Sequence, residues 1–462
     1  MSVFKAYDIR GVYPDEIDEH LFYRVGRASV AFLQCNEMVV GRDMRVSSPS
    51  LARAFCDGVI DQGCSVIDIG QVSTPLLYFA GRSHPACAMV TASHNPKEYN
   101  GLKICRGDSL LPVDATSGLL RIQAFVEEER FSSPRHKGLV THKNFVQAYV
   151  KFSLSFLKAK RPASVVVDAG NGMGGITFRE LMKEDVPFTL HPLYFTPDGS
   201  FPHHVPNPAL PDTLTELAQH VVERRASFGV GLDGDADRCG FVDETGKVVP
   251  PSVLFALIAH ELLLEQPGGC IVADLRMSRV VQDVVRRSGG RLVLAKAGRT
   301  NLKRALLEQR GIFGGELSGH FFFPETAYCE NPIIMLCRVL NMLERTGKPL
   351  SALVRPLSEM YANSGEINLA IADKIGALAA VKDAFADGDV SLLDGVKVDF
   401  PSWWFSLRAS NTEPLMRLVV EAQTESELAV KKAQVLKVLQ PFLVREGSQA
   451  SADFPHGLPP QL

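Results

Sequence analysis

Apolar and polar positions follow one another along the chain in an order that repeats three times. Each repeat starts with a short apolar run that ends in polar residues: MVVGRD from Met38, VVVDAG from Val165 and CIVADLR from Cys270. An amphipathic stretch with helical spacing follows, and then a second apolar run, at 65–70, 188–194 and 291–298. A strand, a helix and a strand in series are typical of parallel pairing. The pattern therefore predicts three related α/β units.

A third apolar run closes each repeat and leads into a loop rich in polar residues. The three junctions are ACAMV before TASHNP at Thr91, SFGVGL before DGDADR at Asp233, and GIFGG before ELSGH at Glu316. The polar loops thus recur at equivalent points of the three units. Open α/β sheets bind their ligands beyond the ends of their strands, so these loops are predicted to face a ligand.

The last part of the chain has a different pattern. From about Ser364 onward, the runs NLAIAD, KVDF, WWFSLR and LMRLVVEA accompany two helical stretches, which indicates an antiparallel sheet with helices on one side. Thr424 and Glu427 form a predicted capping box for the last helix. The predicted organisation is three α/β domains at 1–147, 148–250 and 251–362, a smaller α+β domain at 363–445, and a polar, proline-rich tail at 446–462 that is expected to fray.

Composition limits the classes of partner. A chain of 462 residues is expected to form three or four compact units, and its net charge of −3 gives no reason to expect nucleic acid or an anionic membrane as partner. The longest apolar run, at 252–266, is interrupted by His260 and Glu261 and predicts a core helix. The N-terminus lacks the apolar segment of a signal peptide, and the nine cysteines include no CxxC pair. A cytoplasmic protein with reduced thiols is therefore expected.

Three aspartates alternate in the loop DGDADR: Asp233, Asp235 and Asp237. Carboxylates so close together repel one another unless a hard cation neutralises them, so the loop predicts a Mg²⁺ site. Two alternatives fit less well: an EF-hand loop requires glycine where Arg238 stands, and an aspartyl-phosphatase motif requires threonine or valine where Asp237 or Cys239 stands. A solvated acidic turn is the remaining alternative.

Ser93 in TASHNP is a candidate nucleophile. It lacks the flanking glycines of a hydrolase nucleophile elbow. The turn signal at Asn95-Pro96 leaves open that the segment is only a loop between two strands. The neighbouring His94 and Lys103 supply a cationic setting, which favours a phosphorylated hydroxyl.

Two further loops carry groups suited to a sugar phosphate. In GGELSGH, Glu316 offers an acceptor and Ser318 a donor, which suits vicinal hydroxyls, although a polar hairpin has the same pattern. The loop RASNTEP offers a guanidinium at Arg408, followed by hydroxyls, an amide and backbone N–H groups. Because a strand follows it, phosphate would be held by Arg408 and a backbone nest; an Asx-type turn is the alternative.

These loops together carry a family resemblance. The sequence resembles the α-D-phosphohexomutases, in their phosphomannomutase/phosphoglucomutase branch, from KAYDIRG near the N-terminus to SNTEP and the last strand; TASHNP with NGLKI, and DGDADR, are the most specific motifs. The resemblance implies three related α/β domains and a smaller α+β domain around a central active-site cleft. It also implies a phosphoryl shift between O1 and O6 of a hexose through a hexose 1,6-bisphosphate intermediate.

The resemblance implies a role for each matching residue. Ser93 would be the phosphoserine, and Mg²⁺ would be held by Asp233, Asp235, Asp237 and a phosphate oxygen on Ser93. The other implied roles are catalytic assistance by Arg238, proton transfer by Lys103 or, as second choice, His94, sugar binding by Glu316, Ser318 and His320, phosphate binding by Arg408, Ser410, Asn411 and Thr412, and cleft lining by Tyr7 and Arg10.

Three positions depart from the family pattern. Arg299 stands where many relatives have histidine, and because arginine stays protonated, phosphate binding is the role expected of it. Arg276 replaces a common lysine, a change that suits contact with an anion. The segment CENP from Cys329 stands where relatives usually show acidic residues and glycine, so the wall that faces the sugar is expected to differ.

Two rival functions would use the same residues. A phosphoserine-dependent sugar phosphatase would keep the Mg²⁺ loop and let water finish the reaction, and a non-catalytic sensor would bind a sugar phosphate without turnover. The loop ELSG disfavours the glucosamine branch of the family. The expected partners are small-molecule phosphates of mannose or glucose, and the sequence does not distinguish the two sugars or a monomer from a dimer.

Overall fold

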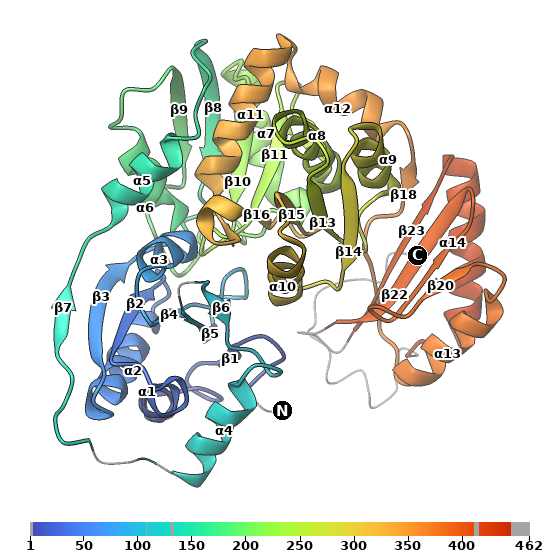
Figure 1. Ribbon diagram of the computed structural model, residues 1–462. Helices are drawn as coiled ribbons and strands as arrows, with labels where there is room; N and C mark the ends of the chain where they lie inside the picture. The colour runs from blue at the N-terminus through green and yellow to red at the C-terminus, as the bar shows by residue number, and fades with distance from the viewer. Residues whose placement is uncertain (1–2, 108, 130, 132–133, 411–414, 445–462) are drawn as a thin grey trace.

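The computed structural model describes residues 3–107, 109–129, 131, 134–410 and 415–444. They form four sheets in chain order, each flanked by helices (Figure 1). The fold class expected from the sequence, three α/β domains of mixed sheets and a smaller α+β domain, is confirmed. The predicted tail at 446–462 lies outside the described residues.

The first sheet has the strand order β1-β5-β4-β2-β3-β7, and β6 pairs with β5. Its strands are β1 (Ile9–Val12), β2 (Glu37–Arg42), β3 (Ser65–Gln71), β4 (Ala86–Val90), β5 (Tyr99–Arg106), β6 (Leu111–Pro112) and β7 (Val140–His142). Its helices are α1 (Glu19–Leu33), α2 (Ser48–Asp61), α3 (Thr74–Gly81) and α4 (Leu119–Glu128). The side chains of Asp18 and Ser73 cap α1 and α3 by accepting from backbone N–H groups of the first turn.

The second and third sheets follow the same plan. The second has the order β12-β11-β10-β8-β9 and the third the order β14-β13-β15-β16-β17. The elements of the second domain are α5 (Val146–Leu154), β8 (Ala163–Asp168), α6 (Gly174–Leu181), β9 (Phe188–Leu193), the 3₁₀ turn Pro211–Leu214, α7 (Thr215–Glu223), β10 (Phe228–Leu232), β11 (Cys239–Asp243) and β12 (Val248–Val249). Those of the third are α8 (Pro251–Glu265), β13 (Cys270–Asp274), α9 (Arg279–Arg287), β14 (Arg291–Ala295), α10 (Arg299–Gln309), β15 (Phe313–Gly315), β16 (Phe321–Phe323), the 3₁₀ turn Pro324–Thr326, β17 (Cys329–Glu330), α11 (Pro332–Thr346) and α12 (Leu350–Ser358).

The predicted threefold repeat is confirmed by the strand pairing. In each domain the first strand of the repeat (β2, β8 or β13) lies between two parallel partners, and the third strand (β4, β10 or β15) then pairs antiparallel with the next. The three polar loops predicted from the sequence connect that antiparallel pair in every case. They therefore occupy the same corner of three similar sheets.

The fourth domain is an antiparallel sheet with the order β18-β23-β22-β21-β20, and β19 also pairs with β23. Its elements are β18 (Ala362–Asn363), β19 (Ile367–Leu369), α13 (Lys374–Ala384), β20 (Asp389–Ser391), β21 (Val396–Asp399), β22 (Trp403–Ala409), β23 (Met416–Ala422), α14 (Glu425–Leu439) and the 3₁₀ turn Gln440–Phe442. The Oγ1 atom of Thr424 accepts from the N–H of Glu427, which is one half of the predicted capping box. The exact domain boundaries stay predictions; α5 spans the one placed after residue 147.

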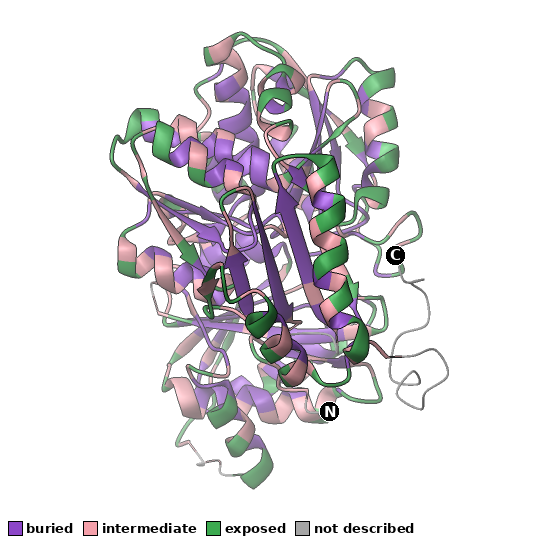
Figure 2. Ribbon diagram, turned by 90° about the vertical axis from the view of Figure 1, so that its right-hand side faces the viewer, coloured by how far each residue is buried: buried purple, intermediate pink, exposed green. Residues whose placement is uncertain are grey.

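Apolar packing joins the first three domains. In Figure 2 most of the strands are buried, whereas most helices bury one side and expose the other. One cluster of buried side chains runs from the first sheet through the second to the third, and α8, the predicted core helix, lies in it. The fourth domain has a separate core around Trp403 and Phe405. No helix in the described ranges has the length and apolar character needed to cross a membrane.

Candidate active site

The loop that follows β4 brings Ser93 to the aspartate loop of the second domain. The Ser93 Oγ atom donates to Asp233 Oδ2 at 2.7 Å and lies 3.2 Å from Nδ1 of His94. Ser93 has a φ of 51°, in the left-handed region that non-glycine residues seldom occupy. Such backbone geometry persists only where the surroundings hold it in place. The Ser93 loop is therefore held by contacts from outside it.

Arg45, in the loop after β2, holds the Ser93 loop by its carbonyl groups. Its two terminal nitrogens donate to the backbone oxygens of Ser93, Asn95, Pro96 and Tyr99, at 3.0, 2.6, 2.6 and 2.9 Å. Arg45 is only 1 % exposed, and Asp43 balances its charge at 3.3 Å. Sequence reasoning missed this residue, although the polar end of the run MVVGRD, followed by MR, was a signal that could have found it.

Asp233, Asp235 and Asp237 lie together in the loop after β10, and all three are buried. One carboxylate oxygen from each lies within 4.8 Å of the others. Burial and the neighbouring Asp237 raise the pKa of Asp233 well above its ordinary value. Asp235 accepts from Thr74 Oγ1 at 2.6 Å. The loop is therefore an enclosed acidic cluster, and the solvated acidic turn considered from the sequence is wrong.

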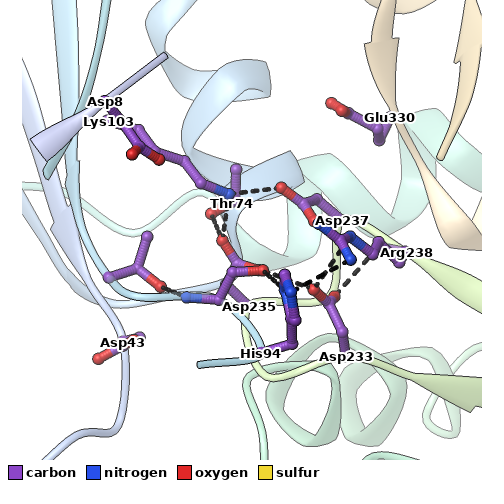
Figure 3. A network of polar contacts seen from close by, with 12 residues as sticks. Asp8, Asp43, Thr74, His94, Lys103, Asp233, Asp235, Asp237, Arg238 and Glu330 are labelled. Atoms are coloured by element: carbon purple, nitrogen blue, oxygen red, sulfur yellow. Dashed lines mark hydrogen bonds and ion pairs between the residues drawn. The ribbon is translucent and has the colours of Figure 1, made fainter. Parts of the chain in front are cut away.

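Lys103 on β5 reaches across to this cluster. Its Nζ atom lies 2.6 Å from Asp235 Oδ2 and 2.5 Å from Asp237 Oδ2, and Figure 3 shows it approaching both carboxylates from one side. Burial opposes the charged form of the lysine, but the two carboxylates outweigh burial and raise its pKa. Although burial also opposes ionisation of Asp235, Lys103 holds the pKa of that carboxyl below its usual range. Lys103 is thus a protonated counter-ion in this arrangement.

His94 has the opposite electrostatic setting. Burial, and then the positive charges of Arg238 and Arg10, lower the pKa of its imidazole well below the ordinary value. The ring is therefore neutral at pH 7, and a neutral imidazole can accept a proton. This geometry favours His94 over Lys103 as a proton acceptor, which reverses the order expected from the sequence.

A chain of polar contacts connects the aspartate loop to the positions that depart from the family pattern. Arg238 Nε donates to His320 Nε2 at 2.9 Å, so Nε2 is the unprotonated nitrogen and the proton is on Nδ1. The Nδ1 atom lies 3.1 Å from Glu330 Oε1. Arg299 Nε in turn donates to Glu330 at 2.8 and 3.1 Å. The two departures, Arg299 and the CENP segment, are therefore partners in one ion pair.

Arg299 is engaged by its own domain and by the first. Besides Glu330, its guanidinium lies 4.3 Å from the ring centre of Tyr78 on α3. Although burial favours the neutral form of Glu330, Arg299 and His320 lower the pKa of that carboxyl to about 2. In this arrangement Arg299 holds a protein carboxylate, so the phosphate-binding role expected from the sequence gains no support.

The candidate sugar-binding residues, in the loop after β15, lie beside the aspartate loop. Ser318 Oγ donates to Glu316 Oε2 at 3.2 Å, and burial raises the pKa of Glu316. The Oε1 atom of Glu316 is buried and has no hydrogen-bond partner among the described residues. Cys239 N donates to Gly319 O at 3.1 Å, which connects the loop after β15 to the end of the aspartate loop. A polar group of a ligand would supply the missing hydrogen bond to the Oε1 atom of Glu316.

The phosphate-loop candidates are described only in part. Arg408 on β22 is 5 % exposed and lies 3.9 Å from Asp394, and Ser410 N donates to Leu415 O at 2.8 Å. Asn411 and Thr412 lie outside the described residues. Arg276, after β13, pairs with Asp274 and donates to Glu366 Oε2 at 2.6 Å. It thereby joins the third domain to the fourth.

The two N-terminal candidates differ in what they contact. Tyr7 Oη donates to Ala297 O at 3.1 Å, next to the start of α10 in the third domain. Arg10 Nη1 donates to Thr91 O at 2.9 Å, at the start of the Ser93 loop, and pairs with Asp8. Tyr7 thus connects the first domain to the third, whereas Arg10 supports the start of the Ser93 loop within the first domain.

Comparison with known proteins agrees with this arrangement. Four sequence profiles match in order: phosphoglucomutase/phosphomannomutase alpha/beta/alpha domain I at residues 1–131, domain II at 143–246, domain III at 250–361, and the C-terminal domain at 366–438. The chain is similar to a protein named "phosphohexose mutases" from Xanthomonas campestris pv. campestris, with 36 % identity over 95 % of this chain and 99 % of that one. It is also similar to an Escherichia coli phosphomannomutase, with 35 % identity over 95 % and 99 % of the two chains.

A solved structure gives the same result. A phosphoglucomutase/phosphomannomutase family protein from Burkholderia thailandensis superposes with a TM-score of 0.87 and 31 % identity, over 95 % of this chain and 97 % of the other. Loops at the same corner of three sheets, with a serine against an acidic cluster, define a phosphoryl-transfer class of enzyme. The chain belongs to the phosphoglucomutase/phosphomannomutase family, the α-D-phosphohexomutases.

Proposed function

We propose that this chain is a phosphohexomutase that interconverts the 1-phosphate and the 6-phosphate of mannose or glucose, with Ser93 as the phosphoserine. The observation that carries the proposal is the contact of Ser93 Oγ with Asp233 at 2.7 Å, because it joins a hydroxyl of the first domain to buried carboxylates of the second. Phosphoryl transfer needs positioning and charge neutralisation at one point. Membership of a family whose members include phosphomannomutases supports the same reaction.

The residues of the aspartate loop suit Mg²⁺. The Oδ1 atoms of Asp235 and Asp237 are buried and lack a hydrogen-bond partner within the described ranges. Buried carboxylate oxygens are costly unless a ligand completes them, and oxygen ligands are those that Mg²⁺ prefers. Asp233, Asp235, Asp237 and a phosphate oxygen on Ser93 would hold the ion. Bound there, Mg²⁺ would neutralise the charge that spreads over the phosphoryl oxygens during transfer.

In the proposed reaction, residues of this chain position the phosphoryl group and accept the proton. The bond between phosphorus and Ser93 Oγ breaks, a bond to a hydroxyl oxygen of the sugar phosphate forms, and the hydroxyl gives up its proton. His94 is the acceptor we propose, because its neutral ring lies 3.2 Å from Ser93 Oγ. Lys103 neutralises Asp235 and Asp237 instead. The bisphosphate then returns its other phosphoryl group to Ser93, so hexose 1,6-bisphosphate is the intermediate and also restores the phosphoserine.

Substrate recognition is assigned to the remaining loops. Glu316 and Ser318 would bind the 3- and 4-hydroxyls, which have the same configuration in glucose and mannose. The phosphate that does not react would be held by the loop after β22, from Arg408 and Ser410 through Asn411 and Thr412. The buried, unpartnered Oε1 of Glu316 supports the first assignment. The burial of Arg408 beside Asp394 supports the second.

The proposal is tested with full-length protein, Mg²⁺, and mannose 1-phosphate or glucose 1-phosphate, together with a trace of hexose 1,6-bisphosphate. We expect the corresponding 6-phosphate to form and intact-mass analysis to detect phosphate on Ser93. Turnover of neither sugar contradicts the substrate assignment. Release of inorganic phosphate faster than isomerisation would instead identify the sugar phosphatase considered from the sequence.

A further inference from the structure

Two cysteines face each other at the end of the first sheet that lies away from Ser93. Cys35 lies between α1 and β2, Cys64 lies between α2 and β3, and their Sγ atoms are 3.7 Å apart. Arg45, which holds the Ser93 loop, lies beyond the opposite end of β2. The thiol pair is therefore separate from the phosphoryl-transfer site, and nothing in the proposed reaction uses it.

The backbone around the pair meets the requirements of a disulfide. β2 and β3 are parallel neighbours with Glu37 opposite Ser65, and Ser65 N donates to Asn36 O at 3.0 Å. This register continues to Asn36 opposite Cys64, so Cys35 is one residue further along. A strand spacing of about 4.8 Å and a rise of about 3.3 Å per residue give roughly 5.8 Å between the two Cα atoms, and a disulfide needs about 4.4–6.8 Å. The sulfur atoms, 3.7 Å apart, therefore have to approach by only about 1.7 Å to bond.

The two thiols differ in ways that suit successive oxidation. Cys35 is partly exposed, whereas Cys64 has no exposed surface. The hydrogen bond between them lowers the pKa of Cys35 and raises the pKa of Cys64. Because the thiolate is the reactive form, Cys35 is the residue that an oxidant would reach and oxidise first. Cys64 is then in position to react with the oxidised sulfur.

Other cysteines of the chain lack this combination. Cys87 and Cys105 lie opposite each other on β4 and β5, but they are only 1 % and 2 % exposed. Cys56 on α2 is partly exposed, but burial raises the pKa of its thiol to about 12, so little thiolate forms. These residues serve as comparisons for the pair at 35 and 64.

We propose that Cys35 and Cys64 are a site of reversible oxidation, at which a peroxide converts the two thiols into a disulfide. In the first step the Cys35 thiolate attacks hydrogen peroxide, the O–O bond breaks, and a sulfenic acid and hydroxide form. In the second, the Cys64 sulfur attacks the Cys35 sulfur, the S–O bond breaks, and the hydroxyl leaves as water with the proton of Cys64. In total two thiols are oxidised and one peroxide is reduced to two water molecules.

A disulfide between Cys35 and Cys64 is expected to affect the stability of the first domain. The bond would close the segment 36–63, which contains β2, Arg45 and α2, and closing a loop restricts the unfolded chain. Resistance of this domain to unfolding should therefore rise on oxidation. In the reducing compartment expected from the sequence such disulfides are transient, so the bond would report exposure to oxidant.

The test uses the full-length protein, reduced and then exposed to hydrogen peroxide at near-stoichiometric amounts, and quenched with an alkylating reagent under denaturing conditions. We expect titratable thiols to fall from nine to seven per chain and a reducible peptide pair joining Cys35 to Cys64 to appear. Cys35→Ser should lose the pair and retain its remaining thiols. Cys64→Ala should stop at a sulfenic acid on Cys35 that a dimedone probe traps.

Cys56→Ser should form the Cys35–Cys64 pair to the same extent as the wild type. A linked pair at Cys87 and Cys105, or overoxidation of Cys35 to the sulfinic acid with Cys64 still alkylatable, would overturn the proposal. Because Cys64→Ala removes a buried thiol, circular dichroism is used to check that this variant is folded. If the variant is not folded, the result for Cys35→Ser alone decides the test. These measurements are independent of the proposed mutase activity.

Discussion

Ser93 combines a strained backbone with a hydroxyl aimed at Asp233. If this hydroxyl carries the phosphoryl group, Ser93→Ala lowers kcat by roughly three orders of magnitude, because the covalent route is lost. Binding of hexose phosphate, measured by calorimetry, should change little, since the sugar and phosphate loops are untouched. Phosphate found by mass spectrometry on another residue of the active variant would contradict the assignment.

A conservative substitution distinguishes the catalytic roles proposed for Lys103 and His94. Arginine keeps the positive charge but cannot act as a base. Lys103→Arg should therefore retain a substantial part of kcat if the lysine is a counter-ion, whereas His94→Gln should lower kcat by about 10²-fold at unchanged KM. Steady-state kinetics of the two variants provide the measurement. Lys97→Arg, a substitution at a nearby exposed position, is the control. If Lys103→Arg is completely inactive while His94→Gln is active, Lys103 and not His94 is the general base.

Glu330 gives a prediction with a defined pH dependence. Its folded pKa of about 2 lies below the ordinary value of 4.5, so its stabilisation is present above about pH 4.5 and is lost as pH falls toward 2. Glu330→Gln should therefore reduce the free energy of unfolding by about 3 kcal/mol at pH 7 and by less near pH 3. Denaturant unfolding at both pH values provides the measurement.

The same substitution should also affect catalysis. Without the Glu330 carboxylate, the tautomer of His320 is no longer fixed, and kcat should fall on the order of 10-fold. Glu325→Gln, in the same segment but partly exposed beside Arg338, is the matched control. A stability loss in Glu330→Gln that is the same at both pH values would show that the ion pair with Arg299 is not its cause.

At the scale of elements, the Ser93 loop depends on the loop after β2. Arg45 holds four of its carbonyl groups, and lysine, with one ammonium group, cannot reach all four. Arg45→Lys should therefore slow phosphorylation of Ser93 by hexose 1,6-bisphosphate by about 10- to 100-fold, because each bond from a charged donor is worth about 1.5–3 kcal/mol.

Single-turnover phosphorylation followed by mass spectrometry measures this effect. The exposed change Arg53→Lys on α2 should be neutral. A normal phosphorylation rate in Arg45→Lys, with an unchanged unfolding midpoint, would show that the loop keeps its conformation without the clamp.

The elements themselves were largely predictable from the sequence, because period and length of apolar runs report directly on strands and helices. The equivalent corners of Ser93, Asp233 and Glu316 followed from that pattern. Contacts between distant residues did not follow. The clamp by Arg45 and the pair between Arg299 and Glu330 depend on how loops far apart in the chain approach one another, and no local periodicity encodes this.

At the scale of the whole molecule, the fourth domain is attached differently from the other three. Its apolar core is separate, and polar contacts link it to the third domain. Arg276 bonds to Glu366, and Arg279 lies 3.2 Å from Asp399 and donates to Trp403 O at 3.0 Å. Domains joined mainly by polar contacts are expected to move relative to each other. This domain also carries Arg408.

Arg279→Ala should therefore loosen the fourth domain and raise KM for hexose phosphate by about fivefold, the equivalent of about 1 kcal/mol, with kcat little changed. Hydrogen exchange should become faster in β21 and β22 and stay the same in the first two domains. Arg286→Ala, on the same helix and paired with the neighbouring Asp283, is the control. Faster exchange throughout the chain would instead indicate general destabilisation.

The shared corner of the three α/β sheets has a consequence for divergence within the family. If each corner carries the task proposed for it, a change of length or composition in the loop after β15 would alter sugar choice on a scaffold that leaves the proposed phosphoryl carrier of the first domain in place. Loop exchange between relatives is thus a modular operation at this corner. A threefold duplication of one ancestral unit would have created that modularity at the outset, before any of the loops became specialised.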